Sequence, residues 1–362
     1  MRHPRRSHRI LLATVATLTL APVAVSPGAP APGHHAPAAP AAPEQPGTQE
    51  TRITGIRALG GRAVELVVHS AAMGREIPVR VLPAADPAAA APVLYLLNGI
   101  TGGGDGGNWF DRTDLTEFFG PEQVTVVNPI GGAGSYFTDW RADDPVLGRQ
   151  RWTTFLTAEL PPLIDATYRG SGANALAGVS MAAASVFQLA LAAPGRYRAL
   201  GSYSGCVRTG DPLGRAVVEL VVRSNGGNPF NMWGPPQDRA WSDNDPFLHA
   251  EDLRGLALYI SAGTGEPGAL DTMEGPGIRR NPGKLLDQLL IGGLLETVAA
   301  GCTTRLGTRL HELGIPATVA LRPDGTHSWG YWQRELHDSW PMFAAALSAG
   351  TQPHWGPSQF GR

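Results

Sequence analysis

Two patterns of hydrophobic residues alternate along most of this chain. Short, fully apolar runs are typical of strands that are buried on both faces of a parallel sheet. They occupy residues 93–97, 124–127, 175–178, 200–203, 256–261 and 317–321. Longer segments carry an apolar stripe at helical spacing, most clearly at residues 155–168, 183–193, 285–313 and 332–347. This alternation predicts an α/β protein with a central, mostly parallel sheet that is flanked by helices.

The first predicted strands have a different pattern. Residues 63–69 and 77–82 alternate apolar and polar positions, which predicts an antiparallel pair joined by a turn near Gly74. An antiparallel pair followed by alternating strands and helices is the layout of the α/β-hydrolase fold. We therefore expect that fold.

The two ends of the chain are unlike its middle. Residues 1–26 begin with several arginines, continue with an apolar run at 10–25 and predict a secretory signal peptide. An amphipathic anchor that stays attached is the alternative. Residues 27–50 are rich in Ala and Pro and predict a disordered linker. The folded domain is then expected over 51–350, with a short tail at 351–362, and the protein is expected to be secreted or associated with the cell envelope.

Charge and motif content exclude several kinds of function. The chain has 29 basic and 31 acidic residues and a formal charge of −2, whereas a nucleic-acid binder is strongly basic. No H-E-x-x-H or C-x-x-C pair is present, so we expect no metal site and no cofactor.

A candidate nucleophile lies in Gly178-Val179-Ser180-Met181-Ala182, between a predicted buried strand and an Ala-rich helix. This is the G-x-S-x-G nucleophile elbow with Ala in the last position. The elbow is a tight strand-to-helix turn that leaves no room for large side chains beside the serine. An ordinary turn is the alternative interpretation, and the strand-helix context disfavours it.

An elbow needs amide donors for the negative oxygen that develops during acyl transfer. The strand at 93–97 is followed by a glycine-rich stretch, residues 98–107. We expect the amides of Ile100 and Met181 to form the oxyanion hole. A plain flexible loop is the main alternative, and a phosphate-binding loop is disfavoured because no Gly-Lys-Ser/Thr follows.

A serine nucleophile also needs a base and an acid, in the order Ser, acid, His for this fold. His327 follows the final predicted strand on a Gly-containing loop and is the expected base. The residues alone do not decide which carboxylate is the acid. Asp271 and Glu266 lie after the strand at 256–261, whereas Glu296 lies inside an apolar helix, where a buried carboxylate needs a partner.

Several motifs together resemble the actinobacterial mycolyltransferases, the antigen 85 complex and its corynebacterial relatives. The resemblance covers roughly residues 93–347. The shared runs are Leu97-Asn98-Gly99, Tyr136-Phe137-Thr138-Asp139-Trp140, residues 152–161, Gly178-Val179-Ser180-Met181-Ala182, Met232-Trp233-Gly234-Pro235 and Gly325-Thr326-His327-Ser328-Trp329. Generic esterases share the elbow but not the Met-Trp-Gly-Pro block.

The resemblance implies an acid and a substrate. The family's acid lies on a helix about thirty residues before the histidine, which corresponds to Glu296 and ranks it ahead of Asp271. Sugar contacts are implied for Asn98 and Thr101, although the mycobacterial members carry Asp and Arg in their place. Trp329, next to His327, is expected to contact the sugar as well, with packing in the core as the alternative. The segment at 275–290 is longer than in the family. The family's fibronectin-contact stretch is not recognisable, so fibronectin binding is not carried over.

The implied reaction is acyl transfer from an acylated trehalose to a sugar acceptor on a cell-envelope glycolipid or arabinogalactan, through a seryl ester. A secreted carboxylesterase with the same triad is the alternative. Trp233 and Trp241 are equally compatible with lining the cleft and with packing in the core. Cys206 and Cys302 are expected to form a disulfide if the helix of Glu296 packs beside the active site, and two separate buried thiols are the alternative.

Overall fold

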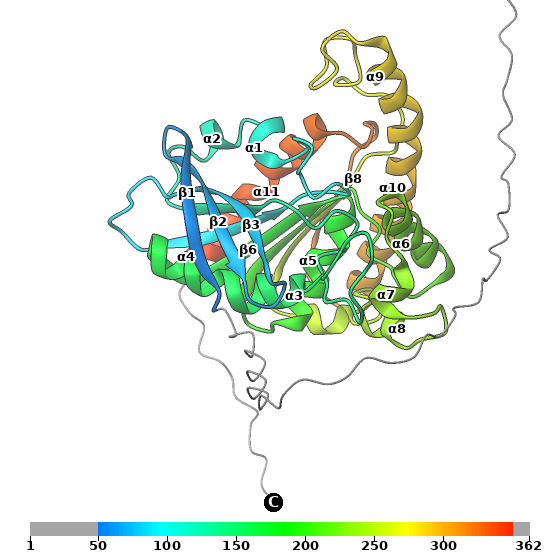
Figure 1. Ribbon diagram of the computed structural model, residues 1–362. Helices are drawn as coiled ribbons and strands as arrows, with labels where there is room; N and C mark the ends of the chain where they lie inside the picture. Colours follow the sequence, from blue (N-terminus) through cyan, green and yellow to red (C-terminus); the bar gives the residue numbers. More distant parts are fainter. Residues whose placement is uncertain (1–49, 350–362) are drawn as a thin grey trace, which may run out of the picture. The chain divides into compact units, whose positions relative to one another are not determined.

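A nine-stranded sheet forms the centre of the described part of the chain, residues 50–349 of a computed structural model (Figure 1). The strand order is β1-β2-β3-β5-β4-β6-β7-β8-β9. The predicted signal peptide, the predicted tail and nearly all of the predicted linker lie outside the described residues.

Most of the sheet is parallel. Neighbouring parallel strands run from β5 to β9, and their bounds are β5 Thr125–Pro129, β4 Ala91–Leu97, β6 Gly170–Val179, β7 Tyr197–Tyr203, β8 Ala257–Ala262 and β9 Thr318–Leu321. Their carboxyl ends meet at one edge of the sheet, where ligands bind in open α/β folds. Three antiparallel strands complete the sheet: β1 Arg52–Gly60, β2 Ala63–Ser70 and β3 Arg75–Leu82.

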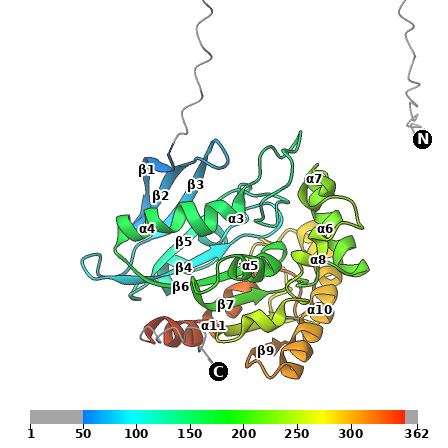
Figure 2. The same cartoon turned by 90° about the horizontal axis from the view of Figure 1, so that it is seen from below.

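Helices cover both faces of the sheet (Figure 2). One hydrophobic core joins α4 (residues 160–168), α5 (181–192) and α10 (293–312) to strand residues such as Tyr95 and Leu97. The other joins α1, α2 and α11 to residues such as Leu94 and Leu96. The alternate residues of β4 therefore enter different cores, which explains why this strand is a continuous apolar run.

The long helices agree with the predicted amphipathic segments: α4 Leu160–Tyr168, α5 Met181–Ala192, α10 Gly293–Glu312 and α11 Trp329–Ser348. Two of them are preceded without a break by π-helical turns, Phe155–Glu159 before α4 and Gln288–Gly292 before α10. The remaining helices are α1 Trp109–Arg112, α2 Leu115–Phe118, α3 Trp152–Thr154, α6 Pro212–Ser224, α7 Pro229–Trp233, α8 Ala240–Asp243, the 3₁₀ turn Ala250–Leu253 and α9 Pro282–Asp287.

The structure differs from the sequence prediction at both edges of the sheet. Strand β1 was not predicted, because most of its side chains are exposed and it carries no buried apolar run. Strand β9 was predicted to be buried on both faces, yet Val319 and Leu321 are exposed. Edge strands are covered on fewer sides, so an apolar run overstates their burial.

Candidate active site

Ser180 lies at the sharp turn between β6 and α5. Its backbone has φ 56° and ψ −119°, a conformation that non-glycine residues rarely adopt. The turn brings neighbouring backbone close, since a Cβ on Gly178 would lie 2.8 Å from the Ala182 carbonyl oxygen. The Ser180 amide donates to the carbonyl of Tyr203 on the adjacent strand at 2.9 Å. The sequence pattern of small residues is thus explained by close packing around a strained serine.

A chain of two hydrogen bonds connects Ser180 to a carboxylate. His327 Nε2 lies 2.8 Å from Ser180 Oγ, and His327 Nδ1 lies 2.8 Å from Glu296 Oε2. The serine follows β6, the histidine lies in the loop between β9 and α11, and Glu296 lies in the first turn of α10. The structure therefore brings together three side chains that are far apart in the sequence.

Glu296 is fully buried, and its second oxygen is also occupied. Oε1 accepts hydrogen bonds from the Gly263 amide at 2.6 Å and the Ser204 hydroxyl at 2.7 Å, and Arg322 Nη2 lies 3.3 Å away. Burial opposes the ionised form. However, the hydrogen bond and charge of His327, together with the bonds from Gly263 and Ser204, hold the pKa of Glu296 below its ordinary value. A carboxylate with these partners can fix the tautomer of a histidine and stabilise its imidazolium.

The residues around Glu296 were not identified from the sequence. Ser204 and Gly263 directly follow β7 and β8, and this position at the carboxyl ends of two parallel strands is the one sequence feature that could have indicated that they lie near the site. Arg322 follows β9 and forms a second ion pair with Glu335, which is buried in α11. Nothing in the spacing of these residues points to a common carboxylate.

The two other carboxylates that were considered as the acid do not contact His327. Asp271 is buried and accepts hydrogen bonds from the Gly268 amide, Gln288, Thr326 and Tyr331. Burial opposes its ionisation, yet these four bonds hold its pKa below the ordinary value. Glu266 is exposed. Only Glu296 among these three is within hydrogen-bond distance of the histidine ring.

The loop after β4 passes directly beside the serine. A Cβ on Gly99 would lie 3.4 Å from the Cβ of Ser180, and the next residue is Ile100. Among the hydrogen bonds of residues 50–349, the amides of Ile100 and Met181 have no acceptor. Met181 is also the first residue of α5, where the helix dipole favours negative charge. These two free donors, one next to Ser180 in the chain and one in the loop beside it, are compatible with an oxyanion hole.

The predicted sugar-contact residues differ in their surroundings. Asn98 is fully buried, and its amide donates to the carbonyls of Gly102 and Pro129. It therefore holds the loop in shape, contrary to the expected substrate contact. Thr101 is partly exposed and donates to Asp105.

The tryptophans separate into two groups. Trp329 is partly exposed and packs edge-to-face against Trp109 and Trp332, and the latter also packs against the His327 ring. Trp233 and Trp241 are buried and pack against each other with ring centroids 5.2 Å apart. The second pair thus belongs to the core, and of these three predicted tryptophans only Trp329 remains a candidate for contact with a sugar.

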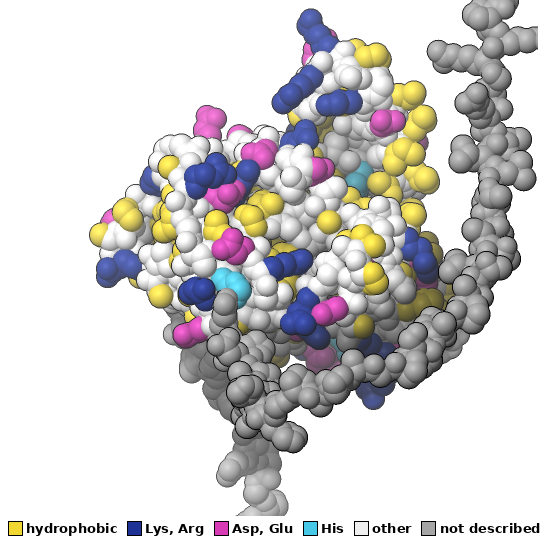
Figure 3. All heavy atoms as spheres, in the orientation of Figure 1, with side chains coloured by type: hydrophobic (Ala, Val, Ile, Leu, Met, Phe, Trp, Pro, Cys, Tyr) yellow, Lys and Arg dark blue, Asp and Glu magenta, His cyan; other side chains and the backbone are white. Residues whose placement is uncertain are grey.

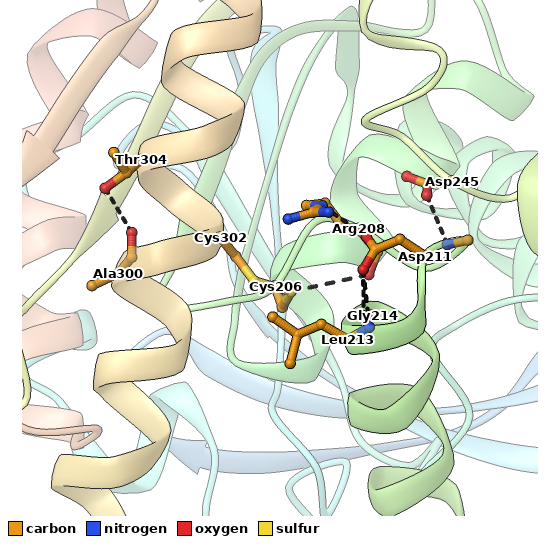
Figure 4. Close-up of a disulfide and its surroundings, with 10 residues drawn as sticks. Cys206, Arg208, Asp211, Leu213, Gly214, Asp245, Ala300, Cys302 and Thr304 are labelled. Atoms are coloured by element: carbon orange, nitrogen blue, oxygen red, sulfur yellow. Dashed lines mark hydrogen bonds and ion pairs between the residues drawn. A yellow bond between two sulfur atoms is a disulfide. The ribbon is translucent and has the colours of Figure 1, made fainter.

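A disulfide joins Cys206 to Cys302, with Cα atoms 4.9 Å apart (Figure 4). Cys206 lies in the loop after β7, and Cys302 lies on α10, six residues beyond Glu296. The bond therefore ties the helix that carries the carboxylate to the loop beside the nucleophile. It closes a sequence separation of 96 residues.

The known proteins that this chain is similar to are described as esterases or acyltransferases. The family described as "Putative esterase" matches residues 70–343. The diacylglycerol acyltransferase/mycolyltransferase Ag85A of Mycobacterium tuberculosis is 32% identical over 323 residues, 86% of this chain and 89% of its own. The corresponding Ag85B protein of Mycobacterium leprae is 32% identical over 294 residues, 78% of this chain and 84% of its own.

Solved structures with the same fold include MPT51 (FbpC1) of Mycobacterium tuberculosis. It has a TM-score of 0.66 at 24% identity and covers 80% of this chain and 100% of its own. An S-formylglutathione hydrolase from Agrobacterium tumefaciens has a TM-score of 0.58 at 17% identity, and the match covers 82% of this chain and 99% of the hydrolase. The predicted α/β-hydrolase fold is confirmed.

Proposed function

This chain belongs to the mycolyltransferase family of α/β-hydrolase enzymes, and we propose that it is a secreted serine acyltransferase that acts in assembly of the cell envelope. Its donor is a trehalose ester of a mycolyl-type acid, and its acceptor is a second sugar hydroxyl on trehalose monoester or arabinogalactan. The observation that carries the proposal is the hydrogen-bonded chain Ser180–His327–Glu296 on a nucleophile elbow. It occurs in a chain 32% identical to proteins named mycolyltransferases.

In the first half-reaction, Ser180 Oγ attacks the ester carbonyl while its proton passes to His327 Nε2. The negative charge moves onto the carbonyl oxygen, where the amides of Ile100 and Met181 donate hydrogen bonds. Glu296 stabilises the imidazolium that has formed. When the tetrahedral intermediate collapses, the bond to trehalose breaks and His327 returns the proton to the departing sugar oxygen. A seryl ester and free trehalose result.

In the second half-reaction, a hydroxyl of the acceptor sugar attacks the seryl ester. His327 takes the hydroxyl proton and then gives it to Ser180 Oγ as the acyl–serine bond breaks. The acyl group ends on the acceptor, and the enzyme regains its starting state. Thr101 and Trp329 are proposed to contact the sugars, because both are partly exposed, Thr101 directly after Ile100 and Trp329 at the start of α11, two residues after His327.

Hydrolysis is the second candidate function, because water can take the place of the acceptor without any change in the triad. The match of the esterase family over residues 70–343 favours this alternative. The two activities differ only in which nucleophile reaches the seryl ester.

A product assay separates the two functions. The protein is incubated with a trehalose monoester of a long-chain acid, and the products are identified by mass spectrometry. Trehalose diester together with free trehalose is the expected result. Free acid without diester would identify a hydrolase, and formation of either product by the Ser180→Ala protein would overturn the serine mechanism.

A further inference from the structure

One long helix combines the active site with an unusual surface. Helix α9, the π turn and α10 form one continuous helix from Pro282 to Glu312. Among the described residues it is the one helix that is long and apolar enough to cross a membrane, and only 28% of its apolar stretch is buried. Its inner face holds the fully buried Glu296 and the disulfide-bonded Cys302. The helix therefore cannot leave the domain without dismantling the site.

The outer face of this helix is apolar and open to solvent. Five side chains on successive turns are 41–64% exposed: Leu286, Leu290, Ile291, Leu294 and Leu295. We call them the apolar edge. In Figure 3 hydrophobic side chains run down the outer side of the protruding helix. A group of large aliphatic side chains exposed on one element is uncommon on a soluble monomer and marks a surface that contacts a protein, a ligand or a membrane.

Basic residues lie beside the apolar edge. Arg279, Arg280 and Lys284 are all exposed at the protruding end, and Lys284 is the single lysine of the whole sequence. Residues 274–287 also contain the carboxylates of Glu274 and Asp287, so the segment has one net positive charge, and Arg280 forms an ion pair with Glu274 at 3.6 Å. Leucines next to exposed cations are the composition of helices that lie in the boundary between lipid and water.

The apolar edge lies directly next to the triad. Leu295 precedes Glu296 in the chain, and the carbonyl of Gly292 accepts a hydrogen bond from the His327 amide at 3.2 Å. A lipid surface against this edge would be one or two helical turns from the groups around Ser180. An ester whose acyl chain remains in that surface could then reach the serine without complete transfer into water.

We propose that the apolar edge and the adjacent cations dock this protein onto a lipid surface that carries anionic headgroups. The side chains of the apolar edge enter the apolar boundary, and Arg279 and Lys284 contact the headgroups. The helix lies along the surface, because its other face is occupied by the active site. Docking is independent of the proposed function, since lipid binding is measured without turnover.

The test is co-sedimentation of the full chain with phosphatidylcholine vesicles with and without phosphatidylglycerol. The Leu290→Gln/Leu294→Gln protein is expected to bind mixed vesicles with an affinity that is lower by about tenfold or more, because two partly exposed leucines no longer enter the lipid. The matched control is Leu213→Gln/Leu220→Gln on α6, whose leucines are similarly exposed, at 48% and 63%. This control is expected to bind as the unmodified protein does. Hydrolysis of a short, soluble ester is the folding control and is expected to be unchanged in both variants.

A photoreactive lipid identifies which part of the chain enters the vesicle, because the residues before Glu50 include another apolar stretch. Label is expected in the peptide that spans residues 284–295. Label confined to residues 1–49, or equal binding by the Leu290→Gln/Leu294→Gln protein, would overturn the proposal. So would a protein that is a dimer in solution and becomes a monomer on this substitution, because a second copy would then cover the edge.

The cations have their own test. Arg279→Gln/Lys284→Gln is expected to weaken binding to mixed vesicles at least fivefold, since each basic residue near an anionic surface contributes about 1 kcal/mol, or about a fivefold change. Binding to pure phosphatidylcholine is expected to stay the same. Equal loss on both vesicles, or no loss on either, would reject the anionic partner.

Discussion

Two buried carboxylates, Glu296 and Asp271, accept hydrogen bonds from residues in and around the loop that carries His327. Both have pKa values held below the ordinary range by several hydrogen bonds despite burial. They differ in what they hold. Glu296 accepts from the His327 ring, whereas Asp271 accepts from the hydroxyls of Thr326 and Tyr331, which lie before and after the histidine.

This comparison teaches that burial does not identify a catalytic acid. The cost of burying an unpaired carboxylate was one reason to favour Glu296 from the sequence, and the same reason applies equally to Asp271. What distinguishes the two is the partner. One carboxylate can respond to the charge on the imidazole ring, and the other holds the side chains of Thr326 and Tyr331, which precede and follow the histidine in the chain.

The largest expected effect comes from Ser180, which lies at the other end of the hydrogen-bonded chain from Glu296. Ser180→Ala is expected to lower kcat by about 10⁴-fold to 10⁶-fold, because the nucleophile is lost and only binding and the oxyanion donors remain. The thermal unfolding midpoint is expected to change little, since the hydroxyl contributes only the contact to His327. Turnover measures the loss of kcat, and labelling by a serine-directed phosphonate identifies the nucleophile. Labelling that persists at another residue would reject Ser180.

The direct test of the comparison is a pair of matched substitutions. Glu296→Gln is expected to lower kcat/KM by about 10³-fold to 10⁴-fold, because a neutral amide neither fixes the tautomer of His327 nor stabilises its positive charge. Asp271→Asn is expected to lower activity by about tenfold or less. Its main effect is a loss of about 1–3 kcal/mol in the free energy of unfolding, since an amide cannot accept all four hydrogen bonds.

Steady-state kinetics and denaturant unfolding of both proteins separate these two roles. If Asp271→Asn proves the more damaging change for catalysis, the acid follows β8 and the assignment of Glu296 is wrong.

The disulfide should affect the helix that carries Glu296 and spare the surroundings of Asp271. Cys206→Ser/Cys302→Ser is expected to lower the free energy of unfolding by about 2–4 kcal/mol, because the denatured chain is no longer constrained. Hydrogen exchange should increase on α10 around residue 302 and stay unchanged around Asp271. Unfolding curves with and without the bond measure the first effect, and an equal increase at both carboxylates would contradict the second.

Acid should weaken the fold through both carboxylates. Because their pKa values are lowered on folding, each contributes stability that is complete above the ordinary carboxyl pKa of about 4 and is lost as pH falls through the lower value of the folded state. The free energy of unfolding should therefore rise with pH below about pH 4. The slope should be smaller in Glu296→Gln and in Asp271→Asn than in the unmodified protein, and equal slopes would show that neither carboxylate contributes.

The sequence alone was sufficient where the local geometry depends on neighbouring residues. The elbow could be predicted because a strained serine between a buried strand and a helix needs small residues on both sides, and that requirement appears within five positions. His327 could be predicted from its place after the last strand. The parallel sheet could be predicted because strands buried on both faces must be apolar throughout.

The tertiary structure decided what depends on contacts between distant segments. The partners of Glu296 come from the ends of β7, β8 and β9, and no local pattern relates Ser204, Gly263 and Arg322 to one carboxylate. The same holds for residues 285–313, which the sequence identified as a helix with an apolar stripe. Its first half is apolar on more than one side, so only packing against the domain determined that Glu296 faces His327 and the leucines face solvent.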